Sequence, residues 1–173
     1  MRYPLLLLAV LTLGLSGCGE PSRHSAAPAV TPAVLQSALD DIGTRSRVPV
    51  LIPTRIPEGV KKTWGNIEDD GNKYSISLYA SNDPIGDAGD VAYLSGRTGT
   101  SDFTLPNTRQ VQLKNGHQAT FRPVSCGGSC APANLWWNYK GNQYGVQLTL
   151  PSDMDEQEQQ RRIIDFASSL RER

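Results

Sequence analysis

Residues 135–148 read LWWNYKGNQYGVQL. Aromatic and aliphatic residues of high β-propensity fill both ends of this stretch, and Lys140-Gly141-Asn142 divides them. Glycine adopts the positive φ of a tight turn at little cost, so the middle of the stretch favours a chain reversal. The stretch therefore predicts two antiparallel strands joined by a short turn.

Two further dipeptides predict hairpins of the same kind. Asp70-Gly71 and Asn115-Gly116 both tolerate positive φ, and strand-like sequence with a period of two flanks each of them. Val91-Ala92-Tyr93-Leu94 predicts another strand. Residues 71–78 and 141–148 share four identities, which either marks a duplicated hairpin or reflects chance and common turn chemistry.

Helical spacing of apolar residues occurs near both ends of this region. Thr31-Pro32 suits a helix start, Gly43 suits a helix end, and Ser152 or Asp153 suits the start of the second helix. The apolar residues of the two expected helices are Val34, Leu35, Ala38, Leu39 and Ile42, and Ile163, Phe166, Ala167 and Leu170.

Between the first helix and the first hairpin, residues 48–59 carry a proline at every fourth position. Proline excludes a helix, so we expect an extended segment that lies along an edge of the sheet. Residues 31–173 are then a single α+β domain, an antiparallel sheet of about five to seven strands with an N-terminal and a C-terminal helix packed on it.

Charge and acidic spacing narrow the possible ligands. The chain has seventeen basic and seventeen acidic residues, a balance that argues against nucleic acid as a partner. Asp83, Asp87 and Asp90 lack the alternate-residue spacing of an EF-hand loop. We expect no metal and no cofactor.

The N-terminal residues have the features of an export signal. Arg2 precedes a leucine-rich run that is too short for a membrane span and has the length of a signal-peptide core. The run ends in Leu15-Ser16-Gly17-Cys18, which resembles the lipobox of bacterial lipoproteins. The resemblance implies removal of residues 1–17, a diacylglyceryl group on the Cys18 thiol and an acyl chain on its new amine. An ordinary secretory signal with a chance cysteine is the alternative.

Residues 18–30 are rich in Ser, Ala, Pro and Gly, and their composition predicts a flexible tether. The lipoprotein resemblance also implies a location, because aspartate after the lipidated cysteine is the usual inner-membrane signal and Gly19 stands there instead. We expect a lipid-anchored protein of the outer membrane that faces the periplasm.

Cys126 and Cys130 are the two cysteines left over. In an exported chain a disulfide is the default interpretation, and the intervening Gly127-Gly128 permits the sharp turn that it requires. A redox pair remains an alternative, although such pairs normally have two intervening residues. A copper or zinc site is another, with His117 as its one candidate histidine.

A more distant resemblance covers residues 48–170. Pro57-Glu58-Gly59, the stretch at 135–148 and Ile163-Ile164-Asp165-Phe166-Ala167 are similar to an envelope domain family of unknown function, found in lipoproteins and in anti-sigma-type regulators. The Cys126 to Cys130 loop is not part of that pattern. No catalytic residues come with the family, and the chain has no Gly-x-Ser-x-Gly or His-Glu-x-x-His motif, so we expect no enzyme.

Two hypotheses about function remain. The first is a non-catalytic module that binds another envelope protein or component through its sheet face or an edge strand. The second is a carrier of a small apolar ligand in a sheet–helix pocket, whose expected lining is Trp64, Trp136, Trp137 and Tyr144.

Overall fold

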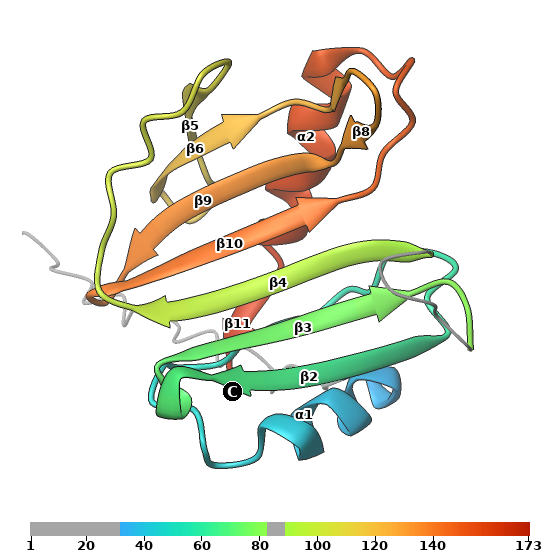
Figure 1. The fold of residues 1–173 in the computed structure, drawn as a ribbon. Helices are drawn as coiled ribbons and strands as arrows, with labels where there is room; N and C mark the ends of the chain where they lie inside the picture. The colour runs from blue at the N-terminus through green and yellow to red at the C-terminus, as the bar shows by residue number, and fades with distance from the viewer. Residues whose placement is uncertain (1–31, 83–88) are drawn as a thin grey trace, which may run out of the picture.

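The computed structural model describes residues 32–82 and 89–173. It confirms the predicted class, α+β, with a seven-stranded antiparallel sheet of order β2-β3-β4-β10-β9-β6-β5 (Figure 1). The elements in chain order are the 3-10 helix η1 (Ala33–Leu35), α1 (Gln36–Ile42), β1 (Leu51–Pro53), β2 (Lys62–Glu68), the 3-10 turn η2 (Asp69–Gly71), β3 (Lys73–Tyr79), β4 (Asp90–Thr98), β5 (Arg109–Gln112), β6 (Gln118–Arg122), β7 (Ser125–Cys126), β8 (Cys130–Ala131), β9 (Ala133–Tyr139), β10 (Asn142–Leu148), α2 (Glu156–Ala167) and β11 (Leu170–Glu172).

All three predicted hairpins form. Lys140 and Gly141 have φ of 50° and 74°, the two positive values that a type I′ turn requires, and they place Trp137 opposite Tyr144. Gly116 has φ of 87° in the β5–β6 hairpin, and η2 joins β2 to β3. The predicted strand at residues 91–94 lies within β4.

The sheet consists of two meanders that meet in its middle. Strands β2, β3 and β4 form one, and β5, β6, β9 and β10 form the other. They join where β10 pairs antiparallel with β4, so β3 and β10 flank the same strand. The similar residues 71–78 and 141–148 therefore end in equivalent strands on either side of β4.

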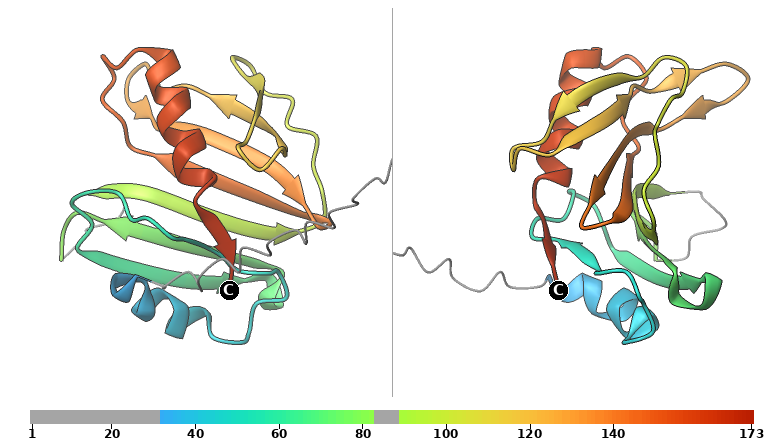
Figure 2. Two further views of the ribbon diagram at one scale, coloured as in Figure 1. Left: turned by 180° about the vertical axis from the view of Figure 1, so that it is seen from behind. Right: turned by 90° about the vertical axis from the view of Figure 1, so that its left-hand side faces the viewer.

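One face of the sheet is covered. Figure 2 shows α2 crossing β9 and β10 on this face and continuing into β11, while α1 packs along β2. The core between these layers contains the largest fully buried side chains of the described residues: Tyr74, Tyr144, Phe121, Leu35, Ile42, Ile76, Leu78, Leu94, Leu135, Ile163, Val48 and Val146.

The prediction that residues 48–59 lie along a sheet edge is wrong. Leu51–Pro53 forms β1, which pairs with β11 in a separate two-stranded ribbon on the covered face, and all three residues are buried. The reason is its composition: Val50, Leu51 and Ile52 are consecutive and apolar, whereas an edge strand needs alternate residues for solvent.

The helix ends differ in detail from the prediction. Asp155 caps α2 by accepting hydrogen bonds from the backbone N–H groups of Gln157 and Glu158, in place of Ser152 or Asp153. Leu170 lies beyond the helix, in β11. Gly43 ends α1 with a positive φ of 56°, but its ψ of −135° is not that of a left-handed helical residue. Thr31, the expected first cap, lies outside the described residues.

Helix α1 closes the outer edge of β2. The Ser37 hydroxyl donates to the carbonyl of Thr63 at 3.1 Å, and the N–H of Gly65 donates to the Asp41 carboxylate at 3.3 Å. Gly65 is required here, because a Cβ atom would lie 2.1 Å from the carbonyl oxygen of Ala38. Two outward backbone groups of this edge strand, the carbonyl of Thr63 and the N–H of Gly65, are thereby occupied, which disfavours pairing with another strand here.

Candidate functional site

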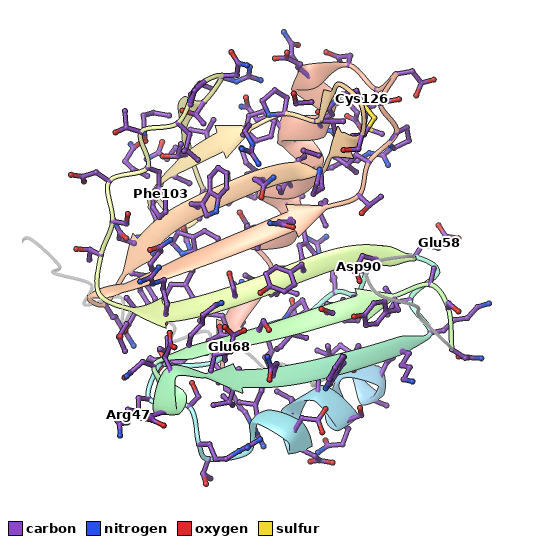
Figure 3. The ribbon with its side chains drawn as sticks, in the orientation of Figure 1. Arg47, Glu58, Glu68, Asp90, Phe103 and Cys126 are labelled. Carbon is purple, nitrogen blue, oxygen red and sulfur yellow. A yellow bond between two sulfur atoms is a disulfide. The ribbon has the colours of Figure 1, made fainter. Side chains whose placement is uncertain are left out.

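The sheet face that points away from α2 is the candidate site. Neither helix nor the β1–β11 ribbon lies on it, and it faces the reader in Figures 1 and 3. We call it the open face and define it by two rows of residues that follow the strand register. The first row is Trp64, Ser77, Tyr93, Gln147, Asn134 and Arg122, and the second is Asn66, Ser75, Ser95, Gly145, Trp136, Thr120 and Gln110.

Uncharged polar and aromatic side chains dominate the open face. Within its two rows Arg122 is the one charged residue, and hydroxyl and amide groups make up most of the rest. Trp64 begins the first row and is 60% exposed, unusual for a tryptophan. Such a surface can form hydrogen bonds and stack on an apolar surface, but it cannot attract a strongly charged ligand from a distance.

Trp136 forms the aromatic centre of the second row. Its ring stacks on Phe103 with 6.0 Å between centroids, and the Arg122 guanidinium lies 5.3 Å from the centroid of the same ring. Figure 3 shows Phe103 on this side of the sheet. Gly145 leaves room for the indole, since a Cβ there would lie 3.1 Å from Trp136 Cδ1. The ring is therefore held by its contacts with Phe103, Arg122 and Gly145.

A segment after β4 is fastened at one end of the open face. The Asn138 side chain accepts a hydrogen bond from the N–H of Ser101 at 3.3 Å and donates to its carbonyl at 3.1 Å. Phe103 follows in the same segment. At this end Lys73 also bonds Glu68 at 2.6 Å, and this hydrogen bond raises the pKa of Lys73.

The opposite end of the open face contains a cavity of about 530 Å³, which we call the hollow. Its volume lies in the range of small-molecule sites. The residues that line it are Asp90, Ala92, Tyr93, Cys130, Pro132, Gln147 and Thr149. Tyr93 and Gln147 belong to the first row, so the row leads from Trp64 into the hollow.

Two polar atoms beside the hollow have no hydrogen-bond partner among the described residues. Oδ1 of Asn134 is an acceptor and Nε of Arg122 is a donor, and both atoms are buried. The two residues are opposite each other in the β6–β9 register. Asn134 is only 1% exposed, and its amide nitrogen is held by the carbonyl of Pro132 at 2.7 Å. A buried polar atom without a partner is destabilising, which marks this position for a ligand group or a water molecule.

Cys126 and Cys130 form the predicted disulfide. Their Cα atoms are 4.0 Å apart, and the bond closes the two-stranded β7–β8 ribbon (Figure 3). Cys130 and Pro132 line the hollow, so this covalent loop shapes one wall of the candidate site. The disulfide leaves neither sulfur as a free thiol.

His117 is not near the disulfide. It precedes β6, whereas Cys126 follows that strand, and its ring packs on Tyr139 with 5.0 Å between centroids. It lines a different cavity of about 240 Å³ together with Trp137 and Leu170. The described residues contain no group of three or more His, Cys, Asp or Glu side chains placed to hold a metal ion. Asp83 and Asp87 lie outside the described residues.

The four aromatic residues predicted to line one pocket lie on two sides of the sheet. Trp137 and Tyr144 are buried on the covered face, where their rings stack with 5.8 Å between centroids. Trp64 and Trp136 are on the open face. Residues of adjacent strand positions point to opposite faces, so Trp136 and Trp137 could not share a cavity.

A cleft does exist between the sheet and α2, with a different lining. It has a volume of about 430 Å³ and lies between residues 55–58, the ends of β4 and β10, and the C-terminal half of α2. Ile56, Leu148 and Phe166 supply apolar surface, and Arg55 and Arg162 are the basic residues in its lining.

Comparison with known proteins identifies no relative of this chain. No family model matches it, and neither do any of the curated proteins or solved structures compared. Neither helix of the described residues is long and apolar enough to cross a membrane.

Sequence reasoning missed the hollow and the pair formed by Asn134 and Arg122. A signal for the open face was present, because amide residues four positions apart, and therefore on one face of a strand, occur at Asn134 and Asn138 in β9 and at Gln143 and Gln147 in β10. The cavity depends on how the β7–β8 ribbon stands beside β4 and β10, which no local pattern encodes.

Proposed function

We propose that the protein is a membrane-anchored lipoprotein of the bacterial cell envelope, and that it binds another envelope component without catalysing a reaction. In this proposal Cys18 carries the lipid, residues 18–30 span the distance from the bilayer, and the outer membrane is the site of attachment. The α+β domain presents its open face to the partner.

One observation carries the binding part of this proposal. An antiparallel sheet can leave one face to solvent, but that face is normally polar. Here it holds an exposed tryptophan, Trp64, in a row that leads into the hollow. Large aromatic side chains contribute strongly to binding energy when a partner covers them. An edge strand is less suited to a partner, because α1 occupies the outer edge of β2.

The experiment is photocrosslinking in cells. A photoreactive amino acid placed at position 64 should give a crosslinked product with an envelope component. The matched control places the same amino acid at Gln157, an exposed position on α2, and should give none. Equal products from both positions, or none from position 64, would exclude the open face as the binding surface.

A second candidate function is carriage of a small apolar ligand. The cleft of about 430 Å³ between residues 55–58 and α2 favours it, because its volume suits a ligand and Phe166 and Leu148 line it. Binding of the apolar dye Nile red should then be lost in Ile56→Glu and kept in Leu105→Glu, a change at an exposed leucine outside the cleft. Equal dye binding by both variants would exclude the cleft.

A further inference from the structure

We propose that the open face binds a neutral glycan, laid across the strands from Trp64 to the hollow. This inference deepens the proposed function by naming the chemical class of the partner, and it rests on the open face being the binding surface. It does not depend on the lipid at Cys18.

The low charge of the two rows is the first argument for a glycan, although Asp90 lines the hollow and Glu68, Lys73 and Arg97 occupy the next position of the register on this face. Both rows of the open face consist of Ser, Thr, Asn, Gln, Gly, Trp and Tyr, apart from Arg122, whose guanidinium lies on the Trp136 ring. Hydroxyl and amide groups complement the hydroxyls of a sugar, since each side can donate and accept. Nucleic acid would require basic residues along the same path, and these rows do not supply them.

The spacing of the aromatic rings is the second argument. Trp64 is on β2 and Tyr93 is on β4, both in the first row, so these two aromatic residues are two strands apart in the sheet. Two strand spacings amount to about 10 Å. A disaccharide unit of an extended glycan has a similar length, and the apolar face of a pyranose ring stacks on an aromatic ring.

The third argument is the pair of unpartnered atoms beside the hollow. The Asn134 Oδ1 atom lacks a donor and the Arg122 Nε atom lacks an acceptor, and the two residues are opposite each other in the register. An acetamido group carries one donor and one acceptor next to each other, and so does each sugar hydroxyl. Asn134 adjoins two residues that line the hollow, because it is opposite Gln147 in the register and bonds the carbonyl of Pro132. A sugar laid over this end of the first row would bring groups of both kinds near the pair.

The sheet edges argue against a peptide as the occupant. Extended peptides bind sheets mainly by adding a strand through main-chain hydrogen bonds. The outer edge of β2 is occupied by Ser37 and Asp41. The other edge strand, β5, is only four residues long, and its Arg109 is bonded to Glu156 of α2 at 2.7 Å. The open face itself offers side chains and not main-chain groups, which suits a glycan.

The test is calorimetric titration of the full chain with hexa-N-acetylchitohexaose, an uncharged oligosaccharide with acetamido groups. If detergent is needed, it must lack a sugar head group, because an alkyl glycoside would compete. We expect saturable binding that does not weaken at high salt, since no ion pair contributes.

Substitutions on the open face test where the glycan binds. Trp64→Ala and Tyr93→Ala should each weaken binding about tenfold or more, as loss of an aromatic anchor does. Trp64→Phe should retain most of the affinity, and Leu105→Ala, at an exposed apolar residue off the rows, should leave it unchanged.

Three results would overturn the proposal: no binding of hexa-N-acetylchitohexaose by the unmodified chain, equal affinity in Trp64→Ala and Leu105→Ala, or binding that high salt abolishes. If position 64 crosslinks to a protein and no glycan binds, the proposed function stands and the glycan proposal is wrong. If position 64 gives no crosslink and no glycan binds, both the proposed function and the glycan proposal are wrong.

Discussion

Tyr74 and Tyr144 stand on either side of Gly96 and hold the same extended segment with their hydroxyls. Both are opposite Gly96 in the register, one on β3 and the other on β10. The Tyr74 hydroxyl accepts from the N–H of Leu51 at 2.9 Å, and the Tyr144 hydroxyl donates to the carbonyl of Pro49 at 3.1 Å. The two tyrosines thereby join both halves of the sheet to the segment that leads into β1.

The two hydroxyls should contribute unequally to stability. Tyr74→Phe leaves the N–H of Leu51 without a partner in the core, and we expect a loss of about 1–3 kcal/mol in the free energy of unfolding. Tyr144→Phe should cost about 1 kcal/mol, because a carbonyl of a half-buried residue can be solvated more readily. Urea denaturation measures both values. If Tyr74→Phe is as stable as the unmodified chain, the hydroxyl does not hold this segment.

The same tyrosines predict how stability depends on alkaline pH. Burial raises the pKa of Tyr144 to about 12 and also raises that of Tyr74, whereas an unfolded tyrosine titrates near pH 10. A raised pKa in the folded state means that the unfolded chain loses its protons first, so stability is complete below about pH 10 and falls as the pH rises through 12. Replacing both residues by Phe should flatten this decline relative to the same change at Tyr93. An equal slope in both proteins would contradict the assignment.

Gly96 should not accept a side chain. A Cβ atom there would lie 2.3 Å from Cε1 of Tyr74 and 3.1 Å from Cε1 of Tyr144. Gly96→Ala must displace a ring in the packed core, and we expect it to cost about 1–3 kcal/mol. Gly128→Ala, with no atom within 4 Å of its Cβ, is the control and should change stability little. Thermal denaturation of the two variants gives the comparison, and equal melting temperatures would refute the close packing.

Cys18→Ser tests the anchor. Serine cannot form the thioether to lipid, so we expect the variant to lose acyl labelling and to appear as precursor or soluble protein. Radiolabelled palmitate and membrane fractionation measure the two effects, and Ser16→Ala, a change that leaves the thiol in place, is the control. Unchanged labelling and membrane retention in Cys18→Ser would exclude lipidation at this residue.

The disulfide should affect the hollow more than the overall stability. Its ring contains few residues, and a short loop constrains the unfolded chain only modestly. We therefore expect Cys126→Ser with Cys130→Ser to lower the melting temperature by a few degrees at most while loosening the wall formed by Cys130 and Pro132. Thiol titration of the unmodified chain should find neither cysteine free, and metal analysis should find no bound copper. Two reactive thiols or one copper ion would reverse the interpretation.

Local chemistry explains which parts of the fold were predictable. Turn residues such as Lys140 and Gly141 act within a few positions, so the hairpins could be predicted from the sequence. The pairing of β4 with β10 and of β1 with β11 depends on contacts between distant residues, and nothing local encodes it. The position of residues 48–59 was predicted wrongly for this reason. Their prolines indicate an extended backbone, but they do not indicate which part of the fold this backbone packs against.

The candidate site divides in the same way. The disulfide was predictable because Cys126 and Cys130 are close in the sequence. The four-aromatic pocket was not, because aromatic content does not say on which face a ring lies. Alternation along β9 already separates Trp136 from Trp137, and applying it strictly would have placed them on opposite faces.

The ribbon formed by β1 and β11 also affects how the domain folds. Leu51 pairs with Glu172, so β1, near the start of the domain, can pair only when β11, at its end, is available. Closing so long a loop carries an entropic cost, and pairings of this range slow folding. Until Leu170–Glu172 emerges, the apolar β1 segment has no strand to pair with, and the chain stays loosely structured for longer. If the chain is exported as we propose, such a delay would keep it unfolded while it passes through the membrane.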